Sequence, residues 1–255
     1  MPLQPKVSLV QWVVFDLNSS PMIYYPQHIA IIPDGNRTRA TLLGQLKHQG
    51  HHAGFKNSID LAKYVFSHTP IKVFSLRWLS TENLLERSKQ ELDYLFKLFK
   101  MVTDELRSFL IEQQVSFRRV GDTTWLPEDL ITYLNEQQQL LSFDSERNVI
   151  LCINYGGRNE IIRGIKKRSE AGGDVTALSE QSFSQFLDFG SFPAVDLVIR
   201  TKGELARRLS GFMLRWIGYA ELFFSKLNFP DFGIHELKEA LERFHERASY
   251  RNFGK

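Results

Sequence analysis

Short apolar runs alternate along the chain with longer amphipathic stretches, and polar residues separate the two kinds of segment. Apolar runs of four to eight residues indicate buried strands, whereas apolar positions three and four apart indicate helices. Strands are expected at 28–32, 72–79, 115–120, 149–153, 196–199 and 222–224, and helices at 53–67, 89–113, 127–141, 159–169, 179–187 and 235–248. This alternation predicts a single α/β domain with a mostly parallel central sheet flanked by helices.

Polar motifs follow four of the predicted strands directly. They occupy residues 34–37, 80–83, 154–158 and 200–204. Because ligands of open parallel sheets bind outside the carboxyl ends of the strands, we expect these motifs to converge on one site.

Glycine and basic residues dominate these motifs. Glycine lets the backbone approach a ligand closely, and guanidinium groups bind phosphate oxygens through charge-assisted hydrogen bonds. The basic candidates are Arg37, Arg39, Arg158, Arg200, Lys202, Arg207 and Arg208. A diphosphate with Mg²⁺ needs only one or two protein carboxylates, and Asp34 and Glu221 are the candidates. The pattern therefore predicts a phosphate site.

Composition adds few constraints. The 32 Lys and Arg residues against 29 Asp and Glu residues give a net charge of +3, which does not call for a nucleic-acid partner. Cys152 is the single cysteine, so no disulfide can form within the chain and a cytoplasmic location is expected. Its apolar neighbours predict a buried side chain rather than a nucleophile.

Several classes of protein lack support. The chain has neither the G-x-x-x-x-G-K-[ST] loop nor the G-x-G-x-x-G fingerprint of nucleotide-binding proteins, and no zinc-ligand spacing. The apolar segment 7–17 is too short and too polar for a membrane span. It also lacks a cleavage site typical of an export signal. We expect residues 1–21 to be an accessory extension and 22–255 to be the catalytic domain.

Five motifs in this order resemble those of the cis-prenyltransferases, the undecaprenyl diphosphate synthase family. They are His-Ile-Ala-Ile-Ile-Pro-Asp-Gly-Asn (28–36), Gly-His-His-Ala-Gly (50–54), Leu-Ser-Thr-Glu-Asn (79–83), Asn-Tyr-Gly-Gly-Arg (154–158), and Ile-Arg-Thr (199–201) leading to Tyr-Ala-Glu-Leu-Phe-Phe (219–224) and Pro-Asp-Phe (230–232). The resemblance covers most of the chain. It implies that isopentenyl diphosphate is added to an allylic diphosphate in a Mg²⁺-dependent reaction and that each new double bond is cis. It also implies that an apolar tunnel beneath the polar motifs holds the growing chain.

The resemblance also implies a role for individual residues. Asp34 and Asn83 are the catalytic residues, with Asp34 and Glu221 at the metal and Asn83 assisting proton removal. The implied substrate-binding residues are Gly35, Asn36, Arg37, Arg39, Lys47, His51, Ser80, Thr81, Glu82, Arg87, Arg200, Arg208 and Ser210. Among these, Arg87, Arg200, Arg208 and Ser210 match the residues that bind isopentenyl diphosphate.

The chain departs from the family pattern in several places. The loop after Asn36 reads Arg-Thr-Arg (37–39) where the family has Gly-Arg-Trp, and Lys47 replaces an arginine. Arg207 and Arg208 are alternatives for one position, and the ending Asn-Phe-Gly (252–254) differs from the usual arginine-containing one. Trp78 replaces a small residue. It should shorten the product if it points into the tunnel, and it is core if it points outward.

These departures leave other functions open. The chain could be a non-catalytic scaffolding subunit of a prenyltransferase complex, or a transferase that joins two allylic units irregularly. The leading expectation is an active homodimeric enzyme that uses farnesyl or a shorter allylic diphosphate. We also expect peripheral contact with a membrane for release of a lipid product.

Overall fold

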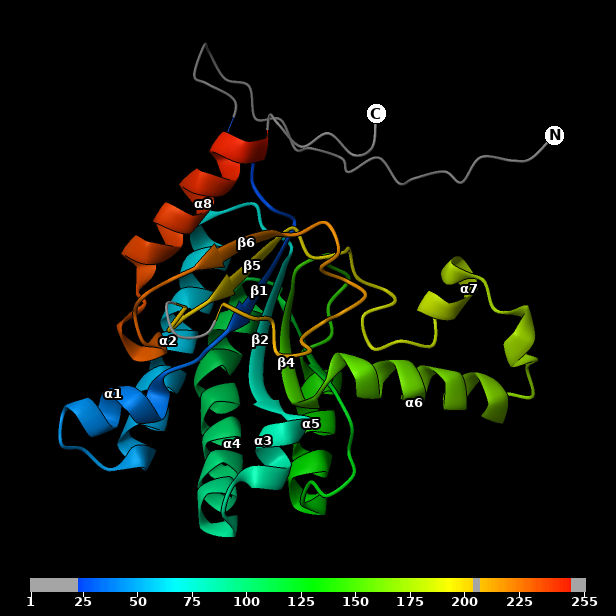
Figure 1. Ribbon diagram of the computed structural model, residues 1–255, viewed down its shortest axis with the longest axis horizontal. Coiled ribbons are helices and arrows are strands. Elements are labelled where there is room, and N and C mark those ends of the chain that lie inside the picture. Colours follow the sequence, from blue (N-terminus) through cyan, green and yellow to red (C-terminus); the bar gives the residue numbers. More distant parts are fainter. Residues whose placement is uncertain (1–22, 204–206, 249–255) are drawn as a thin grey trace.

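The computed structural model describes residues 23–203 and 207–248. Its centre is a six-stranded sheet in the order β3-β4-β2-β1-β5-β6, in which every pairing is parallel (Figure 1). The strands are β1 (His28–Ile32), β2 (Val73–Ser80), β3 (Ser116–Val120), β4 (Asn148–Tyr155), β5 (Leu197–Arg200) and β6 (Glu221–Phe224). The predicted α/β class is confirmed, and each strand lies within two residues of its expected bounds.

Helices cover both faces of the sheet in unequal measure. They are α1 (Asn36–Leu42), α2 (Lys47–His68), α3 (Thr81–Glu86), α4 (Lys89–Glu112), α5 (Glu128–Leu140), α6 (Gly157–Glu170), α7 (Glu180–Ser184) and α8 (Ile234–Ala248), with 3₁₀ turns η1 (Val175–Ala177) and η2 (Phe229–Asp231). Residues of α2, α4, α5 and α8 form the larger apolar core on one face, and residues from 183–195 and 209–217 pack on the other.

Strand β1 shows why the central strands read as unbroken apolar runs. All five of its residues are buried. Since successive side chains of a strand point to opposite faces, Ile29 and Ile31 enter the larger core, whereas Ala30 and Ile32 enter the smaller one.

Two short helices and one helix start differ from the sequence prediction. Helices α1 and α3 occupy segments that were expected to be loops, and α2 begins at Lys47 instead of residue 53. These segments are polar and lack the apolar periodicity by which helices are predicted. Contacts with neighbouring elements, rather than an apolar stripe, hold them in place. The predicted helix 179–187 is also shorter, since only Glu180–Ser184 is helical.

Other expectations have mixed outcomes. Cys152 is fully buried between apolar neighbours, as predicted. Among the described helices, none is long and apolar enough to cross a membrane. Residues 1–21 and 252–254 lie outside the described residues, so the accessory extension and the altered ending stay predictions.

Candidate active site

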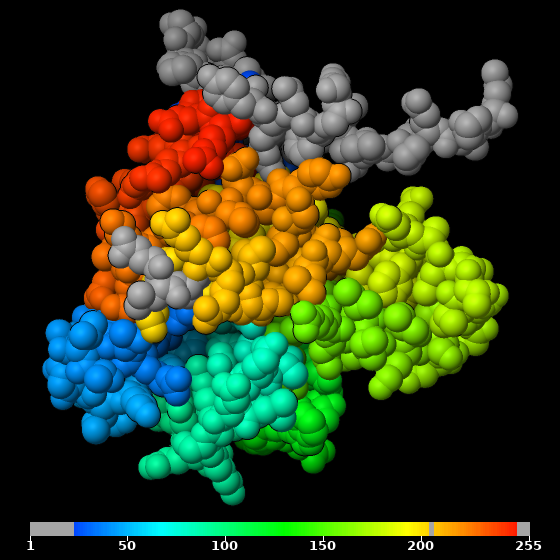
Figure 2. Space-filling model, in the orientation of Figure 1, coloured from blue at the N-terminus to red at the C-terminus, as the bar shows by residue number. Residues whose placement is uncertain are grey.

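A cavity of about 540 Å³ lies at the carboxyl ends of β1, β2 and β5. Helices α1 and α3 and the segment after β5 meet around it on the face shown in Figure 2. Of the predicted site residues, the lining includes Asp34, Gly35, Asn36, Arg37, His51, Ser80, Glu82, Asn83, Arg87, Arg200, Arg208 and Ser210. The predicted convergence of strand ends therefore holds for three of the four motifs.

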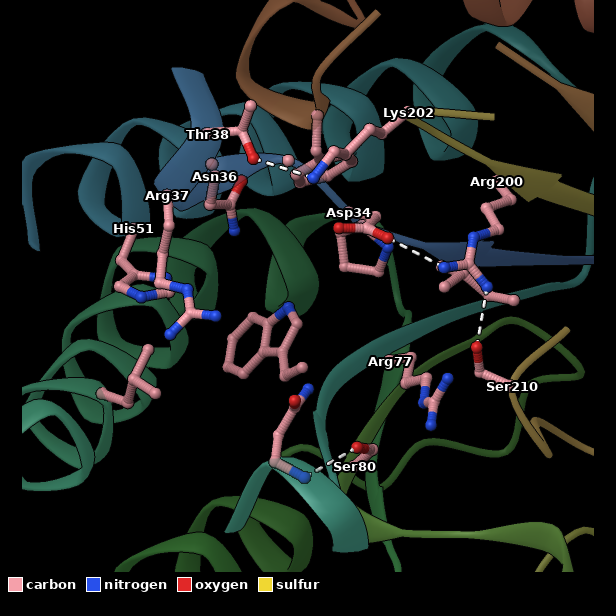
Figure 3. Close-up of a pocket in the computed structure, with 18 of the residues that line it drawn as sticks. Asp34, Asn36, Arg37, Thr38, His51, Arg77, Ser80, Arg200, Lys202 and Ser210 are labelled. Carbon is pink, nitrogen blue, oxygen red and sulfur yellow. Dashed lines mark hydrogen bonds and ion pairs between the residues drawn. The ribbon is translucent and has the colours of Figure 1, made fainter. Parts of the chain in front are cut away.

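Asp34 is held rigidly in the middle of this site. Its backbone N–H donates to the Thr201 hydroxyl at 2.8 Å, and its carbonyl accepts from the same hydroxyl at 2.7 Å. The carboxylate accepts a hydrogen bond from the Arg200 guanidinium at 2.8 Å while the side chain stays 34% exposed. One face of the carboxylate thus remains open to a ligand (Figure 3).

Close backbone approaches around α1 explain the glycines of two motifs. Gly35 has φ +104°, and a Cβ there would lie 2.4 Å from the Asn228 side chain. On α2, a Cβ at Gly50 would clash with the Asn36 carbonyl, and a Cβ at Gly54 would clash with the Asn36 side chain. The glycines therefore seat α1 on α2 and bring Asn36 to the cavity.

Arg200 anchors one side of the site. Its side chain is only 4% exposed, and it donates to the Ser210 hydroxyl at 2.9 Å and to the Arg208 carbonyl. Ser210 has φ +48° and Lys202 has φ +57°, which is uncommon for residues with a side chain. The Lys202 ammonium donates to the Thr38 hydroxyl at 2.9 Å and so links the segment after β5 to α1.

A second cationic group lies on the other side, around Glu91 of α4. Its carboxylate pairs with His51 at 2.9 Å, Arg87 at 3.5 Å and Arg37 at 3.6 Å. Burial lowers the pKa of His51, although the hydrogen bond to Glu91 opposes this shift. Burial would raise the pKa of Glu91, but the hydrogen bond from His51 and the nearby arginines leave it lowered, so Glu91 is an anion at neutral pH.

Helix α3 presents the third group of residues. The Ser80 hydroxyl accepts a hydrogen bond from the Asn83 N–H at 3.1 Å, which caps the helix and fixes Asn83 at the cavity. Glu82 also lines the cavity, whereas Thr81 does not. A Cβ at Gly156 would lie 2.9 Å from the Thr81 hydroxyl oxygen, so the strand-end motif 154–158 packs behind α3.

Trp78 lines the cavity and also belongs to the larger apolar core, so its effect on product length stays a prediction. It lines the cavity together with Phe55, Leu95 and Phe229. Its ring meets Phe55 edge-on with centroids 4.7 Å apart and stacks on Phe99 at 5.2 Å. These aromatic rings form an apolar wall at the inner side of the site. A tunnel beyond this wall stays a prediction.

Four of the predicted site residues lie outside the cavity lining: Arg39, Lys47, Thr81 and Glu221. Arg39 pairs with Asp231 at 2.8 Å, and Lys47 is exposed at the start of α2. Glu221 is in register with Leu197 at the amino end of β5, whereas Asp34 follows the carboxyl end of β1, so one chain does not bring the two carboxylates together. Glu221 pairs with Arg247 at 3.3 Å instead.

Sequence reasoning also missed residues that line the cavity. Arg77 precedes Trp78 on β2 but was hidden among apolar strand residues, and Thr38 was seen only as a departure from the family loop. The Glu91 carboxylate pairs with a histidine and two arginines that line the cavity, although Glu91 does not itself line it. The signal for Glu91 was its spacing of four residues from Arg87, which lies just before α4 and pairs with Glu91 in the first turn of that helix.

The site is rich in buried polar atoms that find no partner within the described part of the chain. They include the Asn36 Oδ1 and the Nε atoms of Arg87 and Arg200. Since buried polar groups in folded proteins are normally hydrogen-bonded, such atoms in a cavity indicate a polar ligand. A cationic cavity at the carboxyl ends of a parallel sheet, with one central carboxylate and an aromatic inner wall, is typical of an enzyme that binds diphosphate esters with an apolar tail.

Comparison with known proteins places the chain within this class. Residues 32–254 match the family described as "Putative undecaprenyl diphosphate synthase". The isoprenyl transferase of Aquifex aeolicus is 37% identical over 234 residues, covering 90% of this chain and 96% of that protein. The ditrans,polycis-undecaprenyl-diphosphate synthase of Buchnera aphidicola is 35% identical over 232 residues, covering 89% of this chain and 91% of that protein.

Solved structures agree with this placement. Lavandulyl diphosphate synthase from Lavandula x intermedia, in complex with dimethylallyl diphosphate, superposes with a TM-score of 0.80 at 31% identity, covering 91% of this chain and 99% of that one. A probable undecaprenyl diphosphate synthase from Campylobacter jejuni gives a TM-score of 0.73 at 30% identity, covering 91% and 100%. The chain belongs to the undecaprenyl diphosphate synthase family and is a transferase of prenyl groups.

Proposed function

We propose that the protein condenses isopentenyl diphosphate with an allylic diphosphate of farnesyl length or shorter, in a Mg²⁺-dependent reaction that forms a cis double bond. The observation that carries this proposal is the central Asp34 carboxylate between two groups of hydrogen-bond donors, each of which contains an arginine. Arg37 and His51 lie on one side and Arg200 with Ser210 on the other (Figure 3). Two diphosphates can therefore bind one cavity with their tails toward the aromatic wall.

The chemistry assigns each side a task. The allylic C–O bond breaks and its electron pair leaves with the diphosphate, which Asn36, Arg37 and His51 stabilise. The double bond of isopentenyl diphosphate, held by Arg200, Arg208 and Ser210, then forms the new C–C bond. The resulting cation loses a proton, and Asn83 at the start of α3 assists its removal. Arg87 contacts Glu91 beside Arg37, so we place it on the allylic side rather than with Arg200.

The residues present fit a Mg²⁺ ion that binds together with substrate. No cluster of three or more His, Cys, Asp or Glu side chains suited to a metal occurs in the ranges that the structure describes. Mg²⁺ commonly uses one or two carboxylates and completes its shell with phosphate oxygens and water. Asp34 would supply the carboxylate, and Asn36 lines the cavity close to it. When bound, the ion offsets charge on the departing diphosphate.

The aromatic wall favours a short product. Trp78 is buried against Phe55 and Phe99, so a growing chain meets a large ring directly behind the polar site. Large side chains at the inner side of an apolar pocket limit the length of ligand that fits.

Irregular joining of two allylic units is the second candidate. The similarity to lavandulyl diphosphate synthase and the space limited by Trp78 favour it. Incubation with dimethylallyl diphosphate as the sole prenyl substrate separates the candidates. A branched ten-carbon diphosphate would support irregular coupling, whereas a requirement for isopentenyl diphosphate would support elongation.

Homodimerisation, cytoplasmic location and peripheral membrane contact belong to the same proposal. Three leucines are exposed next to Lys47: Leu42 ends α1, and Leu43 and Leu46 lie in the connection between α1 and α2. An apolar cluster beside a basic residue suits the surface of a membrane that takes up a prenyl product. No nucleic acid enters the proposed reaction.

The direct experiment incubates the wild-type protein with isopentenyl diphosphate, Mg²⁺ and dimethylallyl, geranyl or farnesyl diphosphate in turn. Mass spectrometry of the extract should show products that differ by one five-carbon unit. A folded protein that makes no product from any of these primers would contradict the proposal and leave the scaffolding role.

A further inference from the structure

Arg77 is a buried cation that the reaction described above does not use. It lies on β2 directly before Trp78, and its side chain is 8% exposed although it lines the cavity. Figure 3 shows its guanidinium near Ser210 and Ser80, on the side of the site where Arg200 lies. The residue therefore faces the same space as Arg200 from a neighbouring part of the sheet.

The Arg77 guanidinium lacks a complete set of hydrogen-bond partners within the described part of the chain. One Nη atom lies 3.4 Å from the Glu82 carboxylate, which is itself 63% exposed, and the guanidinium carbon lies 5.6 Å from the centre of the Phe212 ring. The buried Nε–H has no hydrogen-bond partner among the residues described. Leaving a buried donor unpaired is unfavourable. A solely structural role would have favoured an apolar side chain at this position.

Electrostatics points in the same direction. Burial lowers the pKa of Arg77, Glu82 opposes this shift, and the charge of Arg200 lowers it further. The Nε of Arg200 is likewise buried without a partner in the described ranges. Two guanidinium groups that lie beside one cavity can together bind an anion with several oxygens, and a diphosphate has this form.

We propose that Arg77 is a further ligand of the diphosphate that binds beside Arg200 and Ser210. This proposal rests on the function proposed above, which places isopentenyl diphosphate there. Arg77 would be a substrate-binding residue whose contact with the diphosphate aligns the double bond of that substrate with the allylic carbon. Because Arg77 lies on the Arg200 side of Asp34, it should contribute much less to binding of the allylic diphosphate.

Equilibrium binding tests the proposal without turnover. Calorimetry would measure the dissociation constants of isopentenyl diphosphate alone and of dimethylallyl thiolodiphosphate, whose C–S bond ionises poorly, for wild type and Arg77→Gln. We expect isopentenyl diphosphate to bind about 10- to 100-fold more weakly and the allylic analogue to change less than about 3-fold. Arg118→Gln is the matched control, because Arg118 is a β3 arginine that bonds to Ser142 outside the cavity.

A second variant keeps the test decisive if Arg77→Gln does not fold. Arg77→Lys retains the charge but loses the planar fork, so isopentenyl diphosphate should bind roughly 3- to 10-fold more weakly. Unchanged affinity in the folded variants, or an equal loss for both ligands, would overturn the proposal.

The same protein preparations separate this proposal from the proposed reaction. In steady-state assays, Arg77→Gln should raise the KM for isopentenyl diphosphate much more than the KM for the allylic primer. Wild-type protein that binds isopentenyl diphosphate but gives no product would contradict the reaction and leave the Arg77 assignment standing. Normal wild-type turnover with unchanged Arg77→Gln affinity would overturn the assignment alone.

Discussion

Two groups of buried polar side chains, one at the cavity and one around Glu160, differ in how completely they are hydrogen-bonded. In the cavity, Asn36, Arg77 and Arg200 each keep a buried atom without a partner in the described chain. Beside the smaller core, Glu160 accepts hydrogen bonds from the Tyr155 hydroxyl at 2.6 Å, the Trp216 indole at 3.3 Å and the Asp188 N–H at 2.9 Å. The first group is prepared for a ligand, and the second holds the fold together.

The difference shows how burial should be interpreted in this protein. Burial raises the pKa of Glu160, as does nearby Asp188, while the hydrogen bonds from Tyr155 and Trp216 oppose the shift. A group with a shifted pKa can thus be purely structural when its hydrogen-bond partners are complete. Unpartnered atoms that face a cavity are the better indicator of a site.

The largest expected effect concerns Asp34. Replacing it with Asn removes the central negative charge but preserves the shape of the side chain, so kcat should fall by about 1,000-fold because ionisation of the allylic diphosphate loses the carboxylate that we assign to the metal. Steady-state assays at saturating Mg²⁺ would measure the change. Because Asp34 is 34% exposed, the melting temperature should stay within a few degrees of wild type. Retained turnover would remove Asp34 from the reaction.

The pH dependence of folding stability provides a test at His28, a buried residue that lies outside the cavity lining. It is fully buried, with one ring nitrogen 2.8 Å from the Pro193 carbonyl and the other 2.7 Å from the Ser75 hydroxyl. Burial lowers its pKa from 6.5 to about 4, against the effect of the Pro193 hydrogen bond. The unfolded chain therefore binds the proton more tightly, and stability that is complete above pH 6.5 is lost as the pH falls toward 4.

The expected loss from His28 is about 2 kcal/mol between pH 7.5 and pH 5. Urea unfolding at these two pH values would measure it, and His28→Asn should lose correspondingly less stability over the same interval. The exposed His52 is the matched control, since His52→Gln should keep the wild-type dependence. An identical pH dependence in wild type and His28→Asn would show that His28 is not the titrating group.

Tyr155→Phe should give a smaller effect that falls on the fold alone. The variant removes one hydroxyl from the Glu160 group and should lower the free energy of unfolding by about 1–3 kcal/mol. Both KM values should stay within twofold of wild type, because Tyr155 does not line the cavity. Denaturant titration and steady-state assays would establish both. A selective rise in one KM would mean that the two regions are not independent.

The smallest expected effect concerns the aromatic wall. Trp78→Leu removes the ring that stacks on Phe99 but keeps an apolar side chain, so the product should lengthen by about one five-carbon unit. Mass spectrometry of the product would detect the change. Ile71→Val, a conservative change in the same core outside the cavity, is the control. Identical product lengths in all three proteins would show that Trp78 does not limit the chain.

The sequence predicted the strands well because buried parallel strands are unbroken apolar runs, as in β1 and β4. It missed α1 and α3 because their turns carry no periodic pattern and depend on contacts such as those of Gly50 and Gly54 with Asn36. A motif also does not show which end of a strand its residues occupy. Glu221 was therefore grouped with Asp34, although Glu221 begins β6 at the amino ends of the strands and Asp34 follows the carboxyl end of β1. Arg77 was hidden inside an apolar run.

A crystal structure with bound isopentenyl diphosphate would test the central claim most directly. The diphosphate should lie in the cavity at the ends of β1, β2 and β5, with its oxygens within 3.5 Å of the guanidinium groups of Arg77 and Arg200, since 3.5 Å is about the limit for a hydrogen bond. Another cavity, which Arg119 and Arg163 line on the described part of the chain, should stay free of the diphosphate. A diphosphate bound there, or one that leaves Arg77 and Arg200 without contact, would contradict the assignment of the site.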